Sequence, residues 1–299
     1  MRFSSVYHKE MELIWQNLML SLRWVFALAW GKYDHFHFVR IKLSMIDCHT
    51  HLADASFDED REAVMERAAD VGVQAMVVVG QDAEENQGVL ALTQAKPQLL
   101  AFLGFHPDRY ADHKPLVEEN QIEAILSQVK DNKEVICGIG EVGLDYWVCQ
   151  EPARREAQRE GFAQFVTLAK ELSLPLNVHS RSAGHYTIDF LLEANAKRVL
   201  MHAFDGKASH ALRGAEAGFL FSIPPSIVRS EQKQKLVARL PLESLALETD
   251  SPVLGPRKDE RNEPANVEIS AQTIAEIKGV PLEEVVEVTS ANASRLFGL

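Results

Sequence analysis

The sequence is poor in cysteine and in positive charge. Its 299 residues include three cysteines, Cys48, Cys137 and Cys149, and no C-x-x-C pair. This excludes a disulfide framework and a thiolate zinc site, and it is typical of a reducing compartment, so we predict a cytoplasmic protein. Acidic residues outnumber basic ones by 43 to 31, which gives a net charge of −12. Because such a protein repels polyanions as a whole, any contact with nucleic acid has to be local.

The sequence also lacks a glycine-rich phosphate loop, an internal repeat of fixed period and a linker-like change of composition after Met45. Without a G-x-G-x-x-G turn, an open doubly wound sheet that binds a dinucleotide is disfavoured. The apolar content of 46% and the charged content of 25% are those of a globular protein with a substantial core.

Residues 1–44 differ from the rest of the chain. The apolar stretch 13–30 reaches the ~18 residues of a membrane helix, but it contains Arg23, and a central arginine costs about 2.5 to 3.5 kcal/mol on insertion. The flanking charges also make it a poor signal peptide. We predict an N-terminal appendage at 1–44 with no membrane role, and Met45 is a natural alternative start. One domain, residues 45–299, then remains.

From Met45 onward, short apolar runs alternate with longer amphipathic stretches. The predicted strands cover residues 45–49, 74–79, 99–105, 135–139, 174–178, 198–201, 219–223 and 245–247. The predicted helices cover residues 58–71, 84–94, 118–130, 153–172, 186–194, 207–217, 230–240, 264–278 and 282–297. The strands are almost continuously apolar, as parallel strands buried on both faces are. Eight strand–helix units predict a (β/α)8 TIM barrel, whose typical length is about 250 residues.

Metal-binding residue types stand at the ends of five of these strands. Because all strand ends of a barrel open on one face, we expect them to converge there. The candidates are His49 and His51, Glu141, His179, His202 and Asp250. An H-x-H pair on a strand places both imidazoles on one side. Imidazole and carboxylate without thiolate suit Mg²⁺, Mn²⁺ or Zn²⁺, and six ligands suffice for two ions that share a carboxylate.

Seven motifs in order carry a resemblance to a known family. They are 47–52 (DCHTHL), 104–107 (GFHP), 140–146 (GEVGLDY), 177–181 (NVHSR), 202–206 (HAFDG), 248–252 (ETDSP) and 261–264 (RNEP). Over residues 46–299 the chain resembles the TatD-type metal-dependent deoxyribonucleases. The segments 180–184 (SRSAG), 222–226 (SIPPS) and 232–237 (QKQKLV) look most like the third TatD-domain-containing subgroup of deoxyribonucleases.

The resemblance implies a barrel with a dinuclear metal site. His49, His51 and Asp250 would hold one ion, His179 and His202 the other, and Glu141 would bridge them. It also implies hydrolysis of ester bonds, as a 3′–5′ exonuclease on single-stranded DNA or RNA. The sequence departs from the family pattern at Ser182, where many members are acidic, and at Ala203, where cysteine is frequent. Neither is a ligand position, so these differences bear on substrate preference.

Roles in the reaction follow from these assignments. Asp250 is the candidate general base, or orienter, of an attacking water, with Glu141 as its catalytic partner. His106 and Arg181 lie at or just beyond strand ends and are candidate phosphate-binding residues. Asp145 and Asn262 are expected to fix loops or ligands.

The distribution of basic residues limits the class of substrate that the protein can bind. The candidate basic contacts are Arg229, Lys233, Lys235, Arg257, Lys258 and Arg261. We interpret Lys233 and Lys235 as solvated helix charges, so no basic stripe for a long duplex is indicated. A short strand held at its end needs little more positive surface. We therefore expect DNA or RNA ends, or a small phosphoester, as the substrate.

Two alternatives stay open. An amidohydrolase-type enzyme would act on a small lactone, amide or phosphoester, but such enzymes often bridge their metals with a carboxylated lysine, and no lysine ends a predicted strand. A non-catalytic scaffold would keep a metal for stability, but a structural site is closed by about four ligands, and six ligands on an open face favour catalysis. Nothing in the composition indicates the oligomeric state.

Overall fold

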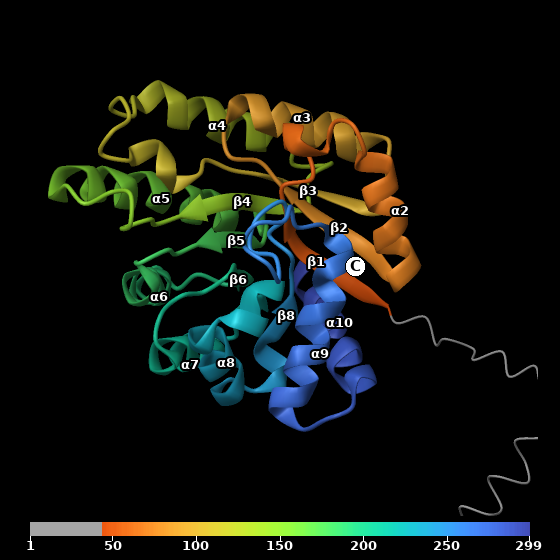
Figure 1. Ribbon diagram of the computed structural model, residues 1–299. Helices are drawn as coiled ribbons and strands as arrows, with labels where there is room; N and C mark the ends of the chain where they lie inside the picture. The colour runs from red at the N-terminus through yellow and green to blue at the C-terminus, as the bar shows by residue number, and fades with distance from the viewer. Residues whose placement is uncertain (1–43) are drawn as a thin grey trace, which may run out of the picture. The chain divides into compact units, whose positions relative to one another are not determined.

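The computed structural model describes residues 44–299, in which eight parallel strands lie side by side in chain order. The strands are β1 (Met45–Thr50), β2 (Val73–Val79), β3 (Leu99–Leu103), β4 (Gly138–Gly143), β5 (Leu176–His179), β6 (Val199–Met201), β7 (Leu220–Ile223) and β8 (Leu245–Leu247). The α-helices are α2 (Arg61–Val71), α3 (Ala83–Gln94), α4 (Glu119–Asp131), α5 (Pro152–Leu172), α6 (Gly184–Glu193), α7 (Ala208–Glu216), α8 (Glu231–Arg239), α9 (Val267–Lys278) and α10 (Leu282–Phe297). Figure 1 shows the strands at the centre and the helices outside. The predicted TIM barrel is confirmed.

The fourth strand lies further along the chain than predicted. β4 covers Gly138–Gly143 rather than 135–139, and Val135 is 65% exposed. The glycines that argue against a strand here are needed for close approach. Gly143 has a φ of 145°, and a Cβ there would lie 2.1 Å from the carbonyl oxygen of His179. The shift places Glu141 inside a strand instead of at its end.

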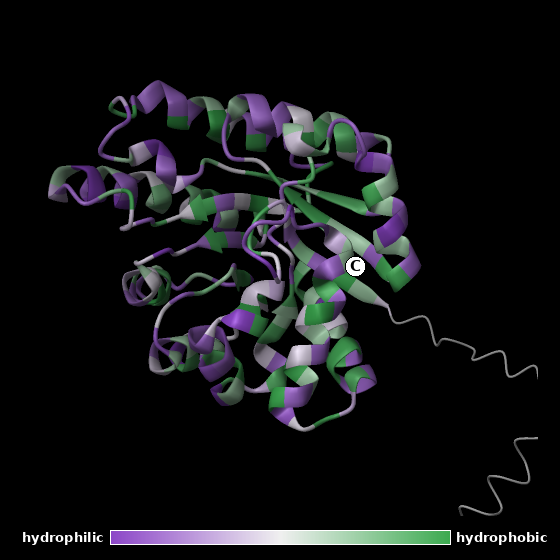
Figure 2. Ribbon diagram, viewed as in Figure 1, coloured by the Kyte–Doolittle hydropathy of each residue, from purple (hydrophilic) through white to green (hydrophobic). Residues whose placement is uncertain are grey.

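Two apolar layers make up the core. One fills the barrel with inward-facing side chains such as Ile46, Val77 and Phe102, and the other lies between the strands and the surrounding helices. Figure 2 shows the strands as mostly hydrophobic, while the helices alternate between hydrophobic and hydrophilic residues. This is the pattern of strands buried on both faces and helices buried on one.

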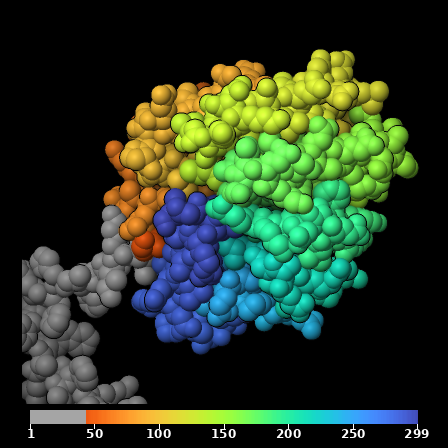
Figure 3. Space-filling view, turned by 180° about the vertical axis from the view of Figure 1, so that it is seen from behind, coloured from red at the N-terminus to blue at the C-terminus, as the bar shows by residue number. Residues whose placement is uncertain are grey.

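Helix α10 covers the end of the barrel where the strands begin. The Ser290 hydroxyl donates to the carbonyl of Ser44 (2.6 Å), and the Arg198 guanidinium donates to the carbonyl of Leu296 (2.7 Å). Phe297 packs edge-on against Phe102 inside the barrel, with 5.5 Å between ring centroids. The view from behind shows α10, in dark blue, against both the orange start of the described chain and its green middle (Figure 3). The opposite end is left for a site.

The first and last strands are joined at that opposite end. The Asp250 amide donates to the carbonyl of His49 (2.9 Å), and the His51 amide donates to the carbonyl of Ser251 (2.9 Å). The Thr249 hydroxyl donates to the buried carboxylate of Asp47 (2.5 Å). These bonds form a seam that holds the loop after β8 against β1.

None of the helices in residues 44–299 combines the length and the apolar character needed to cross a membrane. The predicted appendage, residues 1–44, lies outside the described residues apart from Ser44. Its separation from a domain at 45–299 stays a prediction.

Candidate metal centre

The six residues proposed as metal ligands lie together where the strands end. They come from five strands or from residues soon after them: His49 and His51 (β1), Glu141 (β4), His179 (β5), His202 (β6) and Asp250 (β8). Together with His106, they form three groups in which the candidate ligand atoms lie within 4.8 Å of one another. Each group therefore places its donor atoms close enough for one cation.

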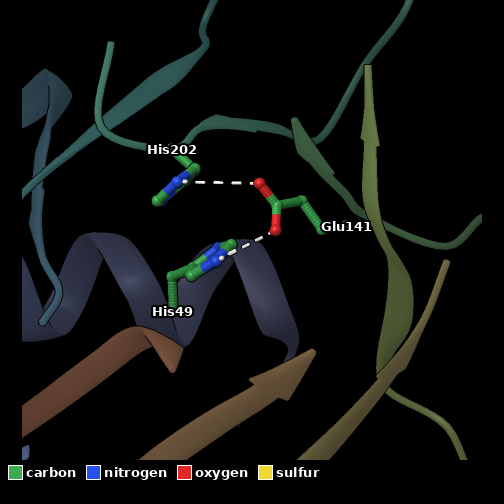
Figure 4. A group of neighbouring side chains, drawn as sticks. All are labelled: His49, Glu141 and His202. Carbon is green, nitrogen blue, oxygen red and sulfur yellow. Dashed lines mark ion pairs between the residues drawn. The ribbon is translucent and has the colours of Figure 1, made fainter. Parts of the chain in front are cut away.

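The innermost group consists of His49, Glu141 and His202, all of them buried. The two carboxylate oxygens of Glu141 lie 3.5 Å from Nε2 of His49 and 3.7 Å from Nε2 of His202. The two imidazoles stack with 3.6 Å between ring centroids. In Figure 4 the ring of His202 lies above that of His49, and the Glu141 carboxylate lies beside the pair with one oxygen toward each ring.

The second group consists of His49, His51 and Asp250, the residues assigned to one ion by family resemblance. The Nε2 atoms of the two histidines lie 3.3 Å apart, and Oδ1 of Asp250 lies 3.5 Å and 3.4 Å from them. Asp250 has a φ of 54°, in the left-handed region that aspartate tolerates better than most residues. The bond from its amide to β1 holds it there.

The third group consists of His106, Glu141 and His179. Oε1 of Glu141 lies 2.6 Å from Nδ1 of His179 and 3.4 Å from Nε2 of His106. The rings of His179 and His202, assigned together to the second ion, are 6.0 Å apart, and Glu141 links them. The structure thus places His106, expected to contact phosphate, among the candidate ligands themselves.

Two side chains missing from the predicted site hold the buried histidines. Nδ1 of His49 lies 2.9 Å from the Asn177 amide oxygen, and Nδ1 of His202 lies 2.9 Å from the Glu248 carboxylate. Both partners are acceptors, so each Nδ1 carries a proton, and each Nε2 faces Glu141 as the nitrogen that would bind a metal ion after losing its own proton. Asn177 lies two residues before His179, on the same side of its strand, which is the signal in the sequence that could have found it.

The donor set fits divalent cations. Imidazole nitrogens and carboxylate oxygens converge there, and the Cys48 thiol, 3.8 Å from the carbonyl of Ile46, belongs to none of the three groups. Burial disfavours the charged form of His49, but the carboxylates of Glu141 and Asp250 outweigh it and raise the pKa of His49 to about 10. Glu141 is also desolvated, yet His106 and His49 hold its pKa well below its usual range. The two carboxylates give this cluster a negative potential, which favours a bound cation.

Both residues expected to fix loops or ligands make such contacts. Oδ2 of Asp145 lies 3.2 Å from Nε2 of His179 and 2.9 Å from the Arg181 guanidinium. Burial opposes its ionisation, but bonds to His179 and Arg181 lower the pKa of Asp145 to about 2. The side-chain amide of Asn262 donates to the carbonyl of Thr249 (2.7 Å) and so holds the loop that carries Asp250.

The cluster forms part of the wall of a cavity of about 530 Å³. Arg181 lines it, 47% exposed and paired with Asp145. The interpretation of Lys233 as a solvated charge is wrong: its side chain lines the cavity, and the residue is only 7% exposed. Lys235, two residues along α8, is 75% exposed and pairs with Glu231, as expected of a surface charge.

Comparison with known proteins gives relatives for almost the whole described chain. A family model described as TatD related DNase matches residues 46–298. The human protein named deoxyribonuclease TATDN3 is 45% identical over 260 residues, which cover 85% of this chain and 95% of that protein. A Bacillus subtilis protein named uncharacterized metal-dependent hydrolase YabD is 33% identical over 259 residues, which cover 85% and 98%.

A solved structure shares the fold. The crystal structure of YjjV, a TatD homologue from Escherichia coli, superposes with a TM-score of 0.77 at 28% identity, covering 85% of this chain and 98% of the other. The described chain therefore has the same fold as a solved TatD homologue.

Proposed function

The chain belongs to the TatD related DNase family and is a metal-dependent hydrolase, and from this premise we propose that it cleaves phosphodiester bonds at the ends of single-stranded DNA or RNA. The family match over residues 46–298 confirms the resemblance that the seven motifs indicated. The observation that supports the proposal best is the buried histidine–carboxylate cluster at the wall of an open cavity.

We assign His49, His51 and Asp250 to one divalent ion and His179 and His202 to another, with Glu141 between them. The two oxygens of Glu141 support this, because one faces His49 and His51 and the other faces His179 and His202. His106, which lies 3.4 Å from Nδ1 of His179, is a further candidate ligand or a phosphate contact. Bound divalent ions would supply Lewis acidity, which lowers the pKa of water and neutralises charge on phosphoryl oxygens.

The chain's own residues position the reaction. Asp250 would accept the proton of the attacking water, and its bonds to β1 fix its carboxylate within 3.7 Å of three histidines. Asn177 and Glu248 keep the inner imidazoles in one tautomer and one orientation. Arg181, at the cavity wall, would contact the phosphate of the substrate.

Size and charge favour an end over a duplex. The cavity of about 530 Å³ lies within the ~300 to 1,000 Å³ of small-ligand pockets, so it suits a terminal nucleotide. The net charge of −12 disfavours a long polyanion lying across the surface.

The test is digestion of end-labelled substrates by metal-reconstituted protein. Single- and double-stranded DNA and RNA, labelled at the 5′ or the 3′ end, are incubated with Mg²⁺, Mn²⁺ or Zn²⁺. We expect stepwise shortening from one end, faster on single strands, and no cleavage with chelator.

Two results would contradict the proposal. Hydrolysis of a neutral lactone or amide panel without nucleic-acid cleavage would favour an amidohydrolase. A chelator-dependent loss of melting temperature, with no hydrolysis of any ester or amide, would favour a metal-stabilised scaffold.

A further inference from the structure

Lys233 is an unusual cation in the wall of the cavity. Three lysine or arginine side chains of residues 44–299 line it: Lys114, Arg181 and Lys233. Lys114 lies 2.7 Å from the carboxylate of Asp108, and Arg181 lies 2.9 Å from that of Asp145. Lys233 is the most buried of the three, and within the described residues no carboxylate lies within 4.0 Å of its ammonium group. Its charge is therefore not consumed by an ion pair.

The hydrogen bonds of Lys233 are also incomplete. An ammonium group has three N–H donors, and the bond seen in residues 44–299 goes to the carbonyl of Ala203 (3.0 Å). Because Lys233 and Ala203 both line the cavity, the remaining N–H donors of Lys233 are available to a ligand bound there. A charged group removed from bulk water requires strong acceptors, and phosphate oxygens are such acceptors.

Helix α8 holds the lysine at this place. The Ser230 hydroxyl accepts from the Lys233 amide (3.3 Å) and caps the helix. The side-chain amide of Gln232 donates to the carbonyl of Gly206 (2.8 Å), and this bond holds the same turn of α8 against the loop after β6. Because His202 begins that loop, the Lys233 ammonium lies beside the ligand end of β6. Arg181 lies beside β5, so the two cations approach the cavity from different strands.

We propose that Lys233 binds a non-bridging oxygen of the substrate phosphate and is the residue that selects anionic over neutral substrates. The inference rests on the proposed function and deepens it, because it names how the site recognises a phosphodiester. Asp250 also lines the cavity, so a phosphate bound by Lys233 lies in the same cavity as the candidate general base.

The experiment compares three variants with wild type. Lys233→Met removes charge and donors, Lys233→Gln keeps a donor for Ala203 without the charge, and Lys235→Met removes a neighbouring exposed charge as the matched control. On single-stranded DNA, we expect kcat/KM to fall about 10- to 100-fold for both Lys233 variants, as for loss of a charge-assisted bond. The plot of log(kcat/KM) against log[NaCl] should become shallower by about 0.7. Lys235→Met should match wild type in both.

A binding measurement separates recognition from structure. Isothermal titration calorimetry of Mg²⁺-loaded protein with deoxythymidine, its 5′-monophosphate and its 3′-monophosphate gives the preference for a charged ligand. Wild type should bind one of the monophosphates more tightly than the nucleoside, by about 10-fold or more beyond the preference of the Lys233 variants. Melting temperatures of all variants verify folding.

The outcomes are distinguishable. If wild type cleaves DNA and Lys233→Gln keeps the wild-type kcat/KM, salt slope and monophosphate preference, the inference is overturned and Lys233 only fastens Ala203. If wild type cleaves no nucleic acid, the proposed function fails, while a monophosphate preference that disappears in both Lys233 variants still supports the phosphate contact.

Discussion

The inner group of the site (His49, Glu141 and His202) and its rim (Lys114 and Arg181) are built in opposite ways. The inner side chains are buried, and Asn177 and Glu248 fix the two histidines. The rim side chains are 29% and 47% exposed, and each already faces a carboxylate. The difference indicates that the inner group is organised for a cation in advance, whereas the rim charges are screened and partly neutralised. Changes to the inner group should therefore cost far more.

Glu141→Gln should have the largest effect. The variant removes the negative charge from the position between the two proposed ions, so we expect kcat on single-stranded DNA to fall by about 10³-fold or more. Glu123→Gln, an exposed change on α4, is the control and should leave kcat unchanged. Full activity of Glu141→Gln in Mg²⁺ and in Mn²⁺ would remove the mechanism.

Glu248→Gln should have the next largest effect. The carboxylate accepts from Nδ1 of His202 and from the amide of Ala203, and loss of such partners of metal-bound histidines costs about 10- to 100-fold in metal affinity or activity. Titration with Mn²⁺, followed by activity, measures the shift. An unchanged affinity would show that the orientation of His202 does not depend on Glu248.

The metal-free protein should become less stable as pH rises. The pKa of His49 is 6.5 in the unfolded chain and about 10 in the folded one, so its contribution is complete below pH 6.5 and is lost between pH 6.5 and 10. Melting temperature in chelator should fall across this range, by roughly 2–4 °C for each kcal/mol lost. Saturating Mn²⁺ should flatten the fall, because the cation replaces the proton.

The control for this pH effect is His49→Gln, which should make the fall in melting temperature shallower without metal, while His106, whose pKa is also raised to about 10, still contributes over the same range. A melting temperature in chelator that rises from pH 6.5 to 10 would show that His49 is not stabilised as the cation.

Arg181→Ala should have the smallest effect. The guanidinium is half exposed and already bonded to Asp145, and exposed ion pairs contribute about 0–1 kcal/mol. We expect KM for single-stranded DNA to rise about 2- to 5-fold with kcat nearly unchanged. A loss as large as that of Glu141→Gln would mean that the rim belongs to the catalytic machinery, and the contrast between the two regions would fail.

The barrel could be predicted from the sequence because most of its strands are continuous apolar runs, the pattern of parallel strands that are buried on both faces. The prediction fails at β4, where the apolar Val135 is exposed and the strand instead runs through three glycines. Those glycines are required by the close approach of neighbouring strands, a tertiary demand that no local pattern of hydropathy reveals.

In the site, too, some features could be predicted from local sequence and others depend on tertiary contacts. The candidate ligands could be named because their types and places at strand ends coincide. The residue type of Lys233 favours a surface charge, although it lies three and four residues before Leu236 and Val237 and shares the buried face of α8 with them. Only the structure shows that its ammonium reaches Ala203. Glu248 directly follows β8 and could be recognised in the sequence as a strand-end carboxylate, but only the structure shows that it holds His202.

The seam between β1 and β8 has a consequence for biosynthesis. It joins residues 201 positions apart, Thr50 and Ser251, whose hydroxyls lie 2.7 Å from each other. At a synthesis rate of ~5–20 residues per second, roughly 10–40 s pass between translation of the first candidate ligands and translation of Asp250. During this time a nascent chain carries His49 and His51 without Asp250, the third member of their group. The group of His49, His51 and Asp250 can therefore form only after most of the chain has been synthesised.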